Sequence, residues 1–218
     1  MNVHDLLPRL PDPAVLAARC RALAVLDTVL DPAAPMHVYQ PGWRDGVALA
    51  RMDNCSGDRW SVVFDPAGVF LHGFDHECDA TPWREDERVH WPGLLDGLPA
   101  SLAHYATAPD FQFEGFFDAT VCVWRETGAD AWLCGPVKFA ADESDGSEWL
   151  FDLLADGSPE AYVRYAEECW GRTVDIEAVR DLMTGAPLTR RTAAGLSPTG
   201  NFEIMAEHVR ALGHPVHP

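Results

Sequence analysis

Lysine is almost absent from this chain, and positive charge is scarce. Lys138 is the one lysine, and 16 basic residues stand against 34 acidic ones, which gives a formal net charge of −18. A negative field of this size repels nucleic acid and anionic lipid, so the sequence argues against both as partners. The partner class that the charge favours is a basic protein, because opposite charge speeds their encounter.

Long hydrophobic runs and paired cysteines are also missing. No apolar run approaches the roughly 18 residues of a membrane-spanning helix. The first residues have neither the basic nor the apolar region of a secretory signal, and we therefore expect a cytoplasmic protein. Six cysteines among 218 residues, none in a CxxC pair, are too few for a disulfide scaffold. Cys55 and Cys78 lie near predicted turns and are expected to be exposed. The cysteines of the apolar segments are expected to be buried: Cys20, Cys122, Cys134 and Cys169.

Several enzyme signatures are absent as well. The chain has no GxxxxGK[ST] or GxGxxG phosphate loop, no GxSxG nucleophile elbow and no HExxH zinc motif. We therefore predict no cofactor. Abundant Ala, Gly, Pro and Arg beside so little Lys indicate a GC-rich bacterial genome.

Among the segments that are present, a β-hairpin carries the strongest local signal. Residues 60–64 and 69–74 are rich in aromatic and β-branched side chains, and the turn Asp65-Pro66-Ala67-Gly68 joins them. Directly after the second strand comes Asp75-His76-Glu77-Cys78-Asp79, so ionisable side chains follow a strand end. Ser56-Gly57-Asp58, before the first strand, is interpreted as a plain turn.

The wider pattern predicts an α+β fold around a central antiparallel meander of about five or six strands. Apolar residues at helical spacing indicate an N-terminal helix over 13–30, with Asp12 as its capping residue. The predicted strand over 119–125 has large side chains on both faces and is expected to be covered on both sides of the sheet. The other predicted segments are strands 36–40 and 47–52 with a break at Pro41-Gly42, a helix within 91–105, and a hairpin of strands 119–125 and 131–140.

The last third is predicted to be helical. Residues 185–200 contain several Gly and Pro and indicate an extended linker. We thus expect a single α+β domain over 1–184, and over 185–218 a linker and a C-terminal helix that packs on the same domain. The predicted helices lie within 146–154 with Trp149 inward, from Ser158 to 170, over 176–183 after Asp175, and from Asn201 to 212.

The residues after the hairpin are the candidates for chemistry. His76 and Glu77, with Asp75, could perform acid–base catalysis, since a carboxylate beside an imidazole raises its basicity. His72, His76 and His90 are weaker candidates for a metal such as Zn, Mn or Fe, because their spacing matches no standard motif. The alternative is structural: Asp75 caps a turn and His76 bonds to backbone, which fixes the loop.

Binding candidates lie in two other segments. Trp83 and Trp91 flank a charged run, where exposed tryptophans would resemble a binding hot spot or would fasten a long loop to the body. Asp142, Glu143 and Asp145 open an acidic stretch that either docks a cationic protein or is simply solvated.

Part of the sequence resembles a group of uncharacterised bacterial proteins. The shared residues are Ser56-Gly57-Asp58, Phe64-Asp65-Pro66-Ala67-Gly68, Gly73-Phe74-Asp75-His76-Glu77, Thr81-Pro82 and Trp91-Pro92-Gly93-Leu94. The resemblance covers about residues 40–180 and implies no activity or site residue. The chain is also similar in kind, without a shared motif, to small acidic bacterial immunity proteins that neutralise toxins.

Two functions follow from these observations, beside a third option, a scaffold or subunit whose surface is mostly buried in a homo-oligomer. The first is a non-catalytic acidic module that binds a basic protein, immunity-like in character, as a monomer or homodimer. The alternative is a hydrolase, metal-dependent or using His and Glu as acid–base groups, with its site in the 72–91 loop.

Overall fold

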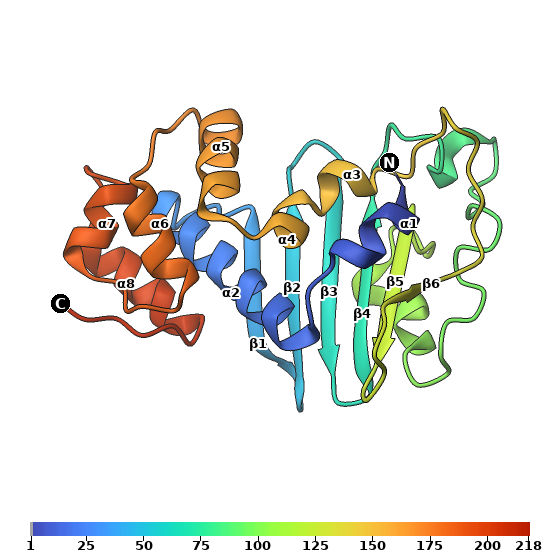
Figure 1. The fold of residues 1–218 in the computed structure, drawn as a ribbon, viewed down its shortest axis with the longest axis horizontal. Helices are drawn as coiled ribbons and strands as arrows, with labels where there is room; N and C mark the ends of the chain where they lie inside the picture. The colour runs from blue at the N-terminus through green and yellow to red at the C-terminus, as the bar shows by residue number, and fades with distance from the viewer. Residues whose placement is uncertain (1) are drawn as a thin grey trace.

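Six antiparallel strands form one sheet, in which each strand pairs with its neighbours in the chain (Figure 1). The structure is a computed structural model, and it describes residues 2–218. The strands are β1 (His37–Arg44), β2 (Val47–Asp53), β3 (Arg59–Asp65), β4 (Gly68–Phe74), β5 (Val121–Glu126) and β6 (Leu133–Cys134).

Helices precede and follow the sheet, which confirms the predicted α+β class with an N-terminal helix and a helical last third. In Figure 1 the C-terminal helices gather beside the β1 edge of the sheet. The helices are α1 (Val3–Leu6), α2 (Pro13–Leu30), α3 (Ser147–Leu150), α4 (Asp152–Asp156), α5 (Pro159–Trp170), α6 (Ile176–Met183), α7 (Arg190–Leu196) and α8 (Phe202–Ala211).

Different parts of the chain cover the two faces of the sheet. On β4, Gly73 lies against Phe151, between α3 and α4. The ring of Phe70 instead stacks with Tyr105 and Phe117 of the β4–β5 connection. Because residues three apart on a strand point to opposite faces, helices cover one face and this long connection covers the other.

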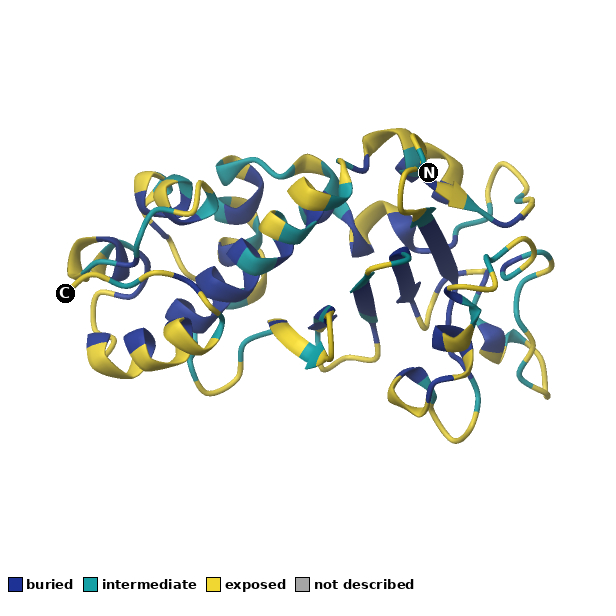
Figure 2. Cartoon of the chain, turned by 90° about the horizontal axis from the view of Figure 1, so that it is seen from below, coloured by how far each residue is buried: buried dark blue, intermediate teal, exposed yellow. Residues whose placement is uncertain are grey.

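One hydrophobic cluster runs through the molecule and includes Leu26 of α2, Val62 of β3 and Val209 of α8. Figure 2 shows the central strands and much of the helical interior as buried, whereas β1, at the sheet edge, and the outer helices and loops carry exposed residues. Among residues 2–218, no helix combines the length and the apolar character needed to cross a membrane.

The predicted β3–β4 hairpin is confirmed. Asp65 pairs with Gly68, and the Asp65 carboxylate accepts a hydrogen bond from the Ala67 N–H at 2.7 Å. A Cβ at Gly68, where φ is +154°, would lie 2.5 Å from the Arg125 carbonyl oxygen on β5. Glycine is therefore required here, because β5 pairs closely against the end of the turn.

The N-terminal helix is also confirmed, but its predicted cap is wrong. Asp12 makes no side-chain hydrogen bond to the first turn of α2. Its carboxylate accepts instead from Arg125 Nη1 at 2.8 Å. The helix starts at Pro13, whose fixed φ suits that position without a side-chain cap.

Three predictions within the sheet region need correction. The helix expected within 91–105 is absent: the segment forms turns, with a short 3₁₀ helix at Ala103–Thr107, because Gly93 and Gly97 adopt positive φ between prolines. The break at Pro41-Gly42 is an irregularity in the β1–β2 register, through which β1 continues. The last strand, β6, has only two residues, whereas β5 is buried on both faces as expected.

The starts of the C-terminal helices are confirmed, since Ser158, Asp175 and Asn201 each accept hydrogen bonds from first-turn N–H groups of α5, α6 and α8. The segment 185–200 is not an extended linker, because it contains α7, capped by Thr189. Residues 146–154 form two short helices in place of one. Trp149, expected to be inward, is 46% exposed.

Candidate functional site

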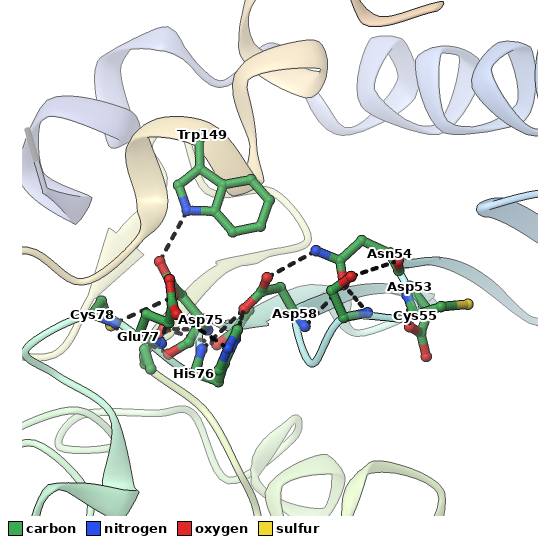
Figure 3. Close-up of polar contacts among 12 residues, drawn as sticks. Asp53, Asn54, Cys55, Asp58, Asp75, His76, Glu77, Cys78 and Trp149 are labelled. Carbon is green, nitrogen blue, oxygen red and sulfur yellow. Dashed lines mark hydrogen bonds and ion pairs between the residues drawn. The ribbon is translucent and has the colours of Figure 1, made fainter. Parts of the chain in front are cut away.

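Asp75 fixes the exit from β4. Its side chain is buried, and one carboxylate oxygen accepts hydrogen bonds from the N–H groups of Glu77 (2.9 Å) and Cys78 (3.2 Å). The other oxygen accepts from the indole N–H of Trp149 at 2.9 Å (Figure 3). Asp75 thus closes a tight turn, as in the structural alternative, and joins this turn to α3.

His76 is held by Asp58, the residue directly before β3. Asp58 Oδ1 lies 2.6 Å from His76 Nδ1 and accepts from the His76 backbone N–H at 3.0 Å. Asn54 donates to the other Asp58 oxygen at 2.8 Å. Ser56-Gly57-Asp58 is therefore more than the plain turn expected, because its aspartate orients the imidazole.

The two partners shift each other's protonation. The hydrogen bond to Asp58 raises the pKa of His76 above its usual value. Burial alone would raise the pKa of Asp58, but the hydrogen bonds from His76 and Asn54 outweigh it, and the pKa is lowered. Both shifts favour a charged imidazolium–carboxylate pair.

Asp58, Asp75 and His76 together form a group that could hold a metal ion. One ligand atom from each lies within 4.8 Å of the others. Two carboxylates and one imidazole suit Zn, Mn or Fe. In the structure these atoms are engaged in hydrogen bonds, so metal binding would replace the Asp58–His76 contact with bonds to the ion.

His72 and His90, the other metal candidates, are outside this group. His72 is buried on β4 against Phe111 and Phe117. His90 donates through Nε2 to the Phe117 carbonyl at 2.6 Å. Of the three weak histidine candidates, only His76 lies in the group of possible ligands that residues 2–218 contain, where it is joined by two aspartates.

Glu77, the second acid–base candidate, is fully accessible. Its side chain is 84% exposed, and a carboxylate oxygen lies 3.7 Å from His76 Nε2. His76 thus has a buried carboxylate at one ring nitrogen and an exposed carboxylate near the other. This arrangement could carry a proton between Nε2 and a bound molecule.

Two cavities border this group. The first, about 510 Å³, is lined by Asn54 and Trp149, which are the partners of Asp58 and Asp75, together with Trp60 and Tyr165. The second, about 340 Å³, is lined by His76 itself and by the aromatic rings of Phe74, Trp83 and Phe113.

The two candidate binding tryptophans differ in role. Trp91 is partly buried, stacks on Phe139 at 5.2 Å between ring centroids and donates its indole N–H to the Lys138 carbonyl. It fastens the loop to the body. Trp83 is 47% exposed, with the Arg88 guanidinium 4.7 Å from its ring. Only Trp83 is therefore available for contact.

Two of the three acidic candidates after the sheet accept hydrogen bonds from backbone N–H groups. Asp145 is buried, accepts from the N–H groups of Val3 (2.7 Å) and Ser147 (2.9 Å), and burial raises its pKa. It cannot contact a docked protein, which corrects its assignment as a binding residue. Glu143 accepts from the Ala140 N–H at 2.6 Å, and Asp142 is exposed.

Sequence reasoning missed Asn54 and Trp149 as parts of the site. Asn54 could have been noticed, because an Asn that precedes a turn commonly accepts from its N–H groups. Its amide oxygen does so with Ser56 and Asp58. No local signal links Trp149 to Asp75, since 74 positions separate them.

Comparison of the chain with protein-family models, with curated proteins and with solved structures finds no match.

Proposed function

We propose that the chain is a cytoplasmic bacterial protein-binding module that takes a basic protein as its partner, immunity-like in its acidity. The surface that carries this function is the Trp83 surface, which we define as Trp83, Glu85, Asp86, Glu87 and Phe113. The observation on which the proposal rests is the orientation of the charged run 84–88, and the exposed aromatic rings and the cavity beside it add support.

The two arginines of the run turn inward. Arg84 donates to the carbonyl oxygens of Thr81 (2.9 Å), Val89 (3.0 Å) and His90 (3.3 Å), and it therefore closes the loop on itself. Arg88 donates to the carbonyl of Phe113 at 2.8 Å. Arg88 also pairs with Glu114 at 3.5 Å and lies 3.9 Å from an Asp118 carboxylate oxygen. Both arginines are therefore engaged with groups of this chain.

The three acids between the arginines are exposed and make no hydrogen bond or ion pair with any residue of 2–218: Glu85, Asp86 and Glu87. The outward charge of this loop is therefore purely negative, although its sequence contains both signs. A basic partner could pair with these three carboxylates without breaking an ion pair or hydrogen bond within the protein.

Exposed apolar side chains lie beside these acids. Trp83 and Phe113 are 47% and 49% exposed, and their ring centroids lie 6.3 Å apart. Aromatic anchors surrounded by charged groups are typical of interaction hot spots. The same two rings line the cavity of about 340 Å³ that His76 borders, which offers a recess for a partner side chain.

Affinity capture from a lysate of the source bacterium tests the proposal. We expect the immobilised protein to retain a basic protein at low salt and to release it as salt rises, since a Debye length of about 10 Å at 0.1 M screens exposed charges. Trp83→Ala and the double variant Glu85→Lys/Glu87→Lys should each abolish retention. Val15→Ala, at another exposed apolar residue on α2, should not. Binding that is independent of salt, or that survives Trp83→Ala, would contradict the proposal.

A second candidate function is an acid–base or metal-dependent hydrolase centred on His76. The observation that favours it is the Asp58–Asp75–His76 group, whose ligand atoms lie within 4.8 Å. In the metal-free form Asp58 would orient the imidazole, and His76 Nε2 would exchange a proton with substrate. In the metal form Asp58, Asp75 and His76 would each supply a ligand atom.

Zinc and manganese titrations followed by calorimetry test the metal form of this candidate. We expect one site that His76→Ala removes and that His208→Ala, at an exposed histidine on α8, preserves. The metal-free form predicts ester hydrolysis that His76→Ala abolishes. If His76→Ala changes neither property, the hydrolase candidate is wrong.

A further inference from the structure

A row of polar side chains crosses three strands on the face of the sheet that the β4–β5 connection covers. Arg51 on β2 pairs with Ser61 on β3, and Ser61 pairs with His72 on β4. Directly paired residues share a face, as do residues two apart on one strand. Arg59, two residues before Ser61, therefore joins this row.

The row forms one wall of a cavity of about 190 Å³. Residues of the β4–β5 connection, among them Asp110 and Phe111, form the opposite wall. The cavity is large enough for a group with several heavy atoms, since one water molecule takes about 30 Å³ of liquid volume.

His72 is the unusual member of this wall. Its residue is 3% exposed, yet neither Nδ1 nor Nε2 has a hydrogen-bond partner within residues 2–218. Arg51 Nε, on the same wall, is also buried without a partner. Buried polar groups in folded proteins are nearly always satisfied, so two unpartnered groups on one cavity indicate a site that accepts a polar ligand.

The charges around the cavity determine which ligand fits. Arg59 pairs with Asp118 at 3.3 Å, and Asp110 pairs with Arg44 at 2.7 Å. Arg51 has no carboxylate within 4.0 Å among the described residues; it contacts the Asp110 carbonyl at 3.5 Å and the Phe111 ring. The Asp110 charge acts on Arg51 without forming an ion pair, and Asp53 also lines the cavity. No carboxylate therefore occupies the donors of the Arg51 guanidinium.

The protonation of His72 agrees with this local positive field. Burial, and then the charges of Arg59 and Arg51, lower the pKa of His72 to about 3. The imidazole is therefore neutral at pH 7 and offers one N–H donor and one acceptor. Arg51, Ser61 and His72 together can donate hydrogen bonds to the oxygens of one anion.

We propose that this cavity binds a small oxyanion, a carboxylate or phosphate group, between Arg51, Ser61 and His72. The inference is independent of the Trp83 surface and of His76. Arg51 supplies the charge and a planar set of donors, which is the geometry that carboxylates and phosphates match. The aromatic rings of Phe70, Phe111 and Phe117 pack around His72.

Calorimetric titration of the whole protein with inorganic phosphate and with acetate, each against sodium chloride of equal ionic strength, tests the proposal. We expect saturable one-to-one binding of at least one anion. Phosphate alone would identify a phosphate group, and acetate alone a carboxylate. Histidine NMR of the unmodified protein should show the His72 imidazole signals move with the same saturation, which needs no variant.

Variants then locate the site. Arg51→Gln and His72→Gln should each weaken binding about tenfold or more, as expected for the loss of one hydrogen bond to an anion. Arg190→Gln, the same charge change at an exposed residue of α7, should leave binding unchanged. The proposal is overturned if neither anion saturates the protein, if the His72 signals do not move, or if Arg190→Gln weakens binding as much as Arg51→Gln.

Discussion

Asp58 holds His76 through two hydrogen bonds that end on the same carboxylate oxygen, one from the ring at 2.6 Å and one from the backbone N–H at 3.0 Å. The side chain of Asp58 is 8% exposed and that of His76 is 41% exposed. The pair therefore joins a sheltered carboxylate to an accessible imidazole, whichever of the two candidate functions applies.

The pair predicts a defined pH dependence of stability. The raised pKa of His76 contributes stability that is complete below the usual value of 6.5 and is lost as the pH rises through the folded pKa. The lowered pKa of Asp58 contributes above the usual value of 3.8 and is lost as the pH falls through the folded pKa. Both contributions are present together between these two usual values.

Urea unfolding at pH 5 and pH 8.5 measures this effect. We expect Asp58→Asn to lower the free energy of unfolding more at pH 5 than at pH 8.5. In NMR titrations the same variant should bring the pKa of His76 down, whereas Asp142→Asn, at an exposed carboxylate, should not. An equal loss at both pH values would show that the charged form of the pair is not stabilising.

Gly146 predicts a second measurable effect, because it lets α3 approach Asp75. Its φ is +78°, and a Cβ there would lie 2.4 Å from Asp75 Cβ. Gly185 has nearly the same φ, +81°, with no atom within 4 Å of such a Cβ. The two glycines separate backbone strain from steric clash.

Gly185→Ala should therefore cost about 1 kcal/mol of unfolding free energy, from the left-handed backbone alone. Gly146→Ala should cost about 3 kcal/mol, since the clash with Asp75 adds to the same strain. It should also change the fluorescence of Trp149, whose indole N–H bonds to Asp75. Equal costs for the two variants would mean that α3 moves away freely.

The features that could be predicted from the sequence are those set by neighbouring residues. Ser158, Asp175 and Asn201 mark their helix starts because a capping side chain acts on N–H groups two or three positions away. The β3–β4 hairpin was predictable for the same reason, since its turn residues are contiguous.

The features that could not be predicted depend on distant contacts or on competing local signals. In 91–105 the apolar spacing indicated a helix, but the glycines and prolines of the segment prevented it. Asp12 has a side chain suited to capping a helix, yet its carboxylate accepts a hydrogen bond from Arg125 of β5. The site followed the same rule: His76 and Asp75 were expected, while Asp58 and Trp149 required the folded chain.

Asp27 provides a third prediction, because it is a fully buried carboxylate. It accepts hydrogen bonds from His37, through the backbone N–H at 2.9 Å and Nδ1 at 2.8 Å, and from the Tyr162 hydroxyl at 2.8 Å. The neighbouring Tyr165 hydroxyl contacts Met36 Sδ, a weak acceptor. Burial, and then the Asp27 charge, raise the pKa of Tyr165, so Asp27 acts on it without accepting the close hydrogen bond that Tyr162 makes. The two tyrosines of α5 thus donate their hydroxyl hydrogen bonds to different acceptors, a carboxylate and a thioether sulfur.

Tyr162→Phe should lower the free energy of unfolding by about 2 kcal/mol, since the fully buried Asp27 carboxyl group loses a hydrogen-bond donor. Tyr165→Phe should cost less than about 1 kcal/mol. Urea unfolding monitored by circular dichroism measures both. If Tyr165→Phe is the more destabilising change, the Asp27 carboxylate does not depend on Tyr162 as the structure indicates.

The reactivity of the cysteines gives the last prediction. The structure changes which of them are exposed compared with the sequence-based expectation. Cys55 is exposed as expected, but Cys78 is buried and Cys169 is exposed. Burial raises the pKa of Cys78 to about 12, and its thiol donates to the Asp75 carbonyl at 3.4 Å. Because the thiolate is the reactive form, Cys78 should be nearly inert in the folded protein.

Iodoacetamide labelling at pH 7.5, followed by peptide mass spectrometry, tests this order. Cys55 should be modified first and Cys169 more slowly, since partial burial raises the Cys169 pKa. Cys78 should react only in denaturant or when Asp75→Ala opens the turn that holds it. Rapid labelling of Cys78 in the unmodified protein would show that the β4 exit opens readily, and Asp75 could then not hold Cys78 and Trp149 in place.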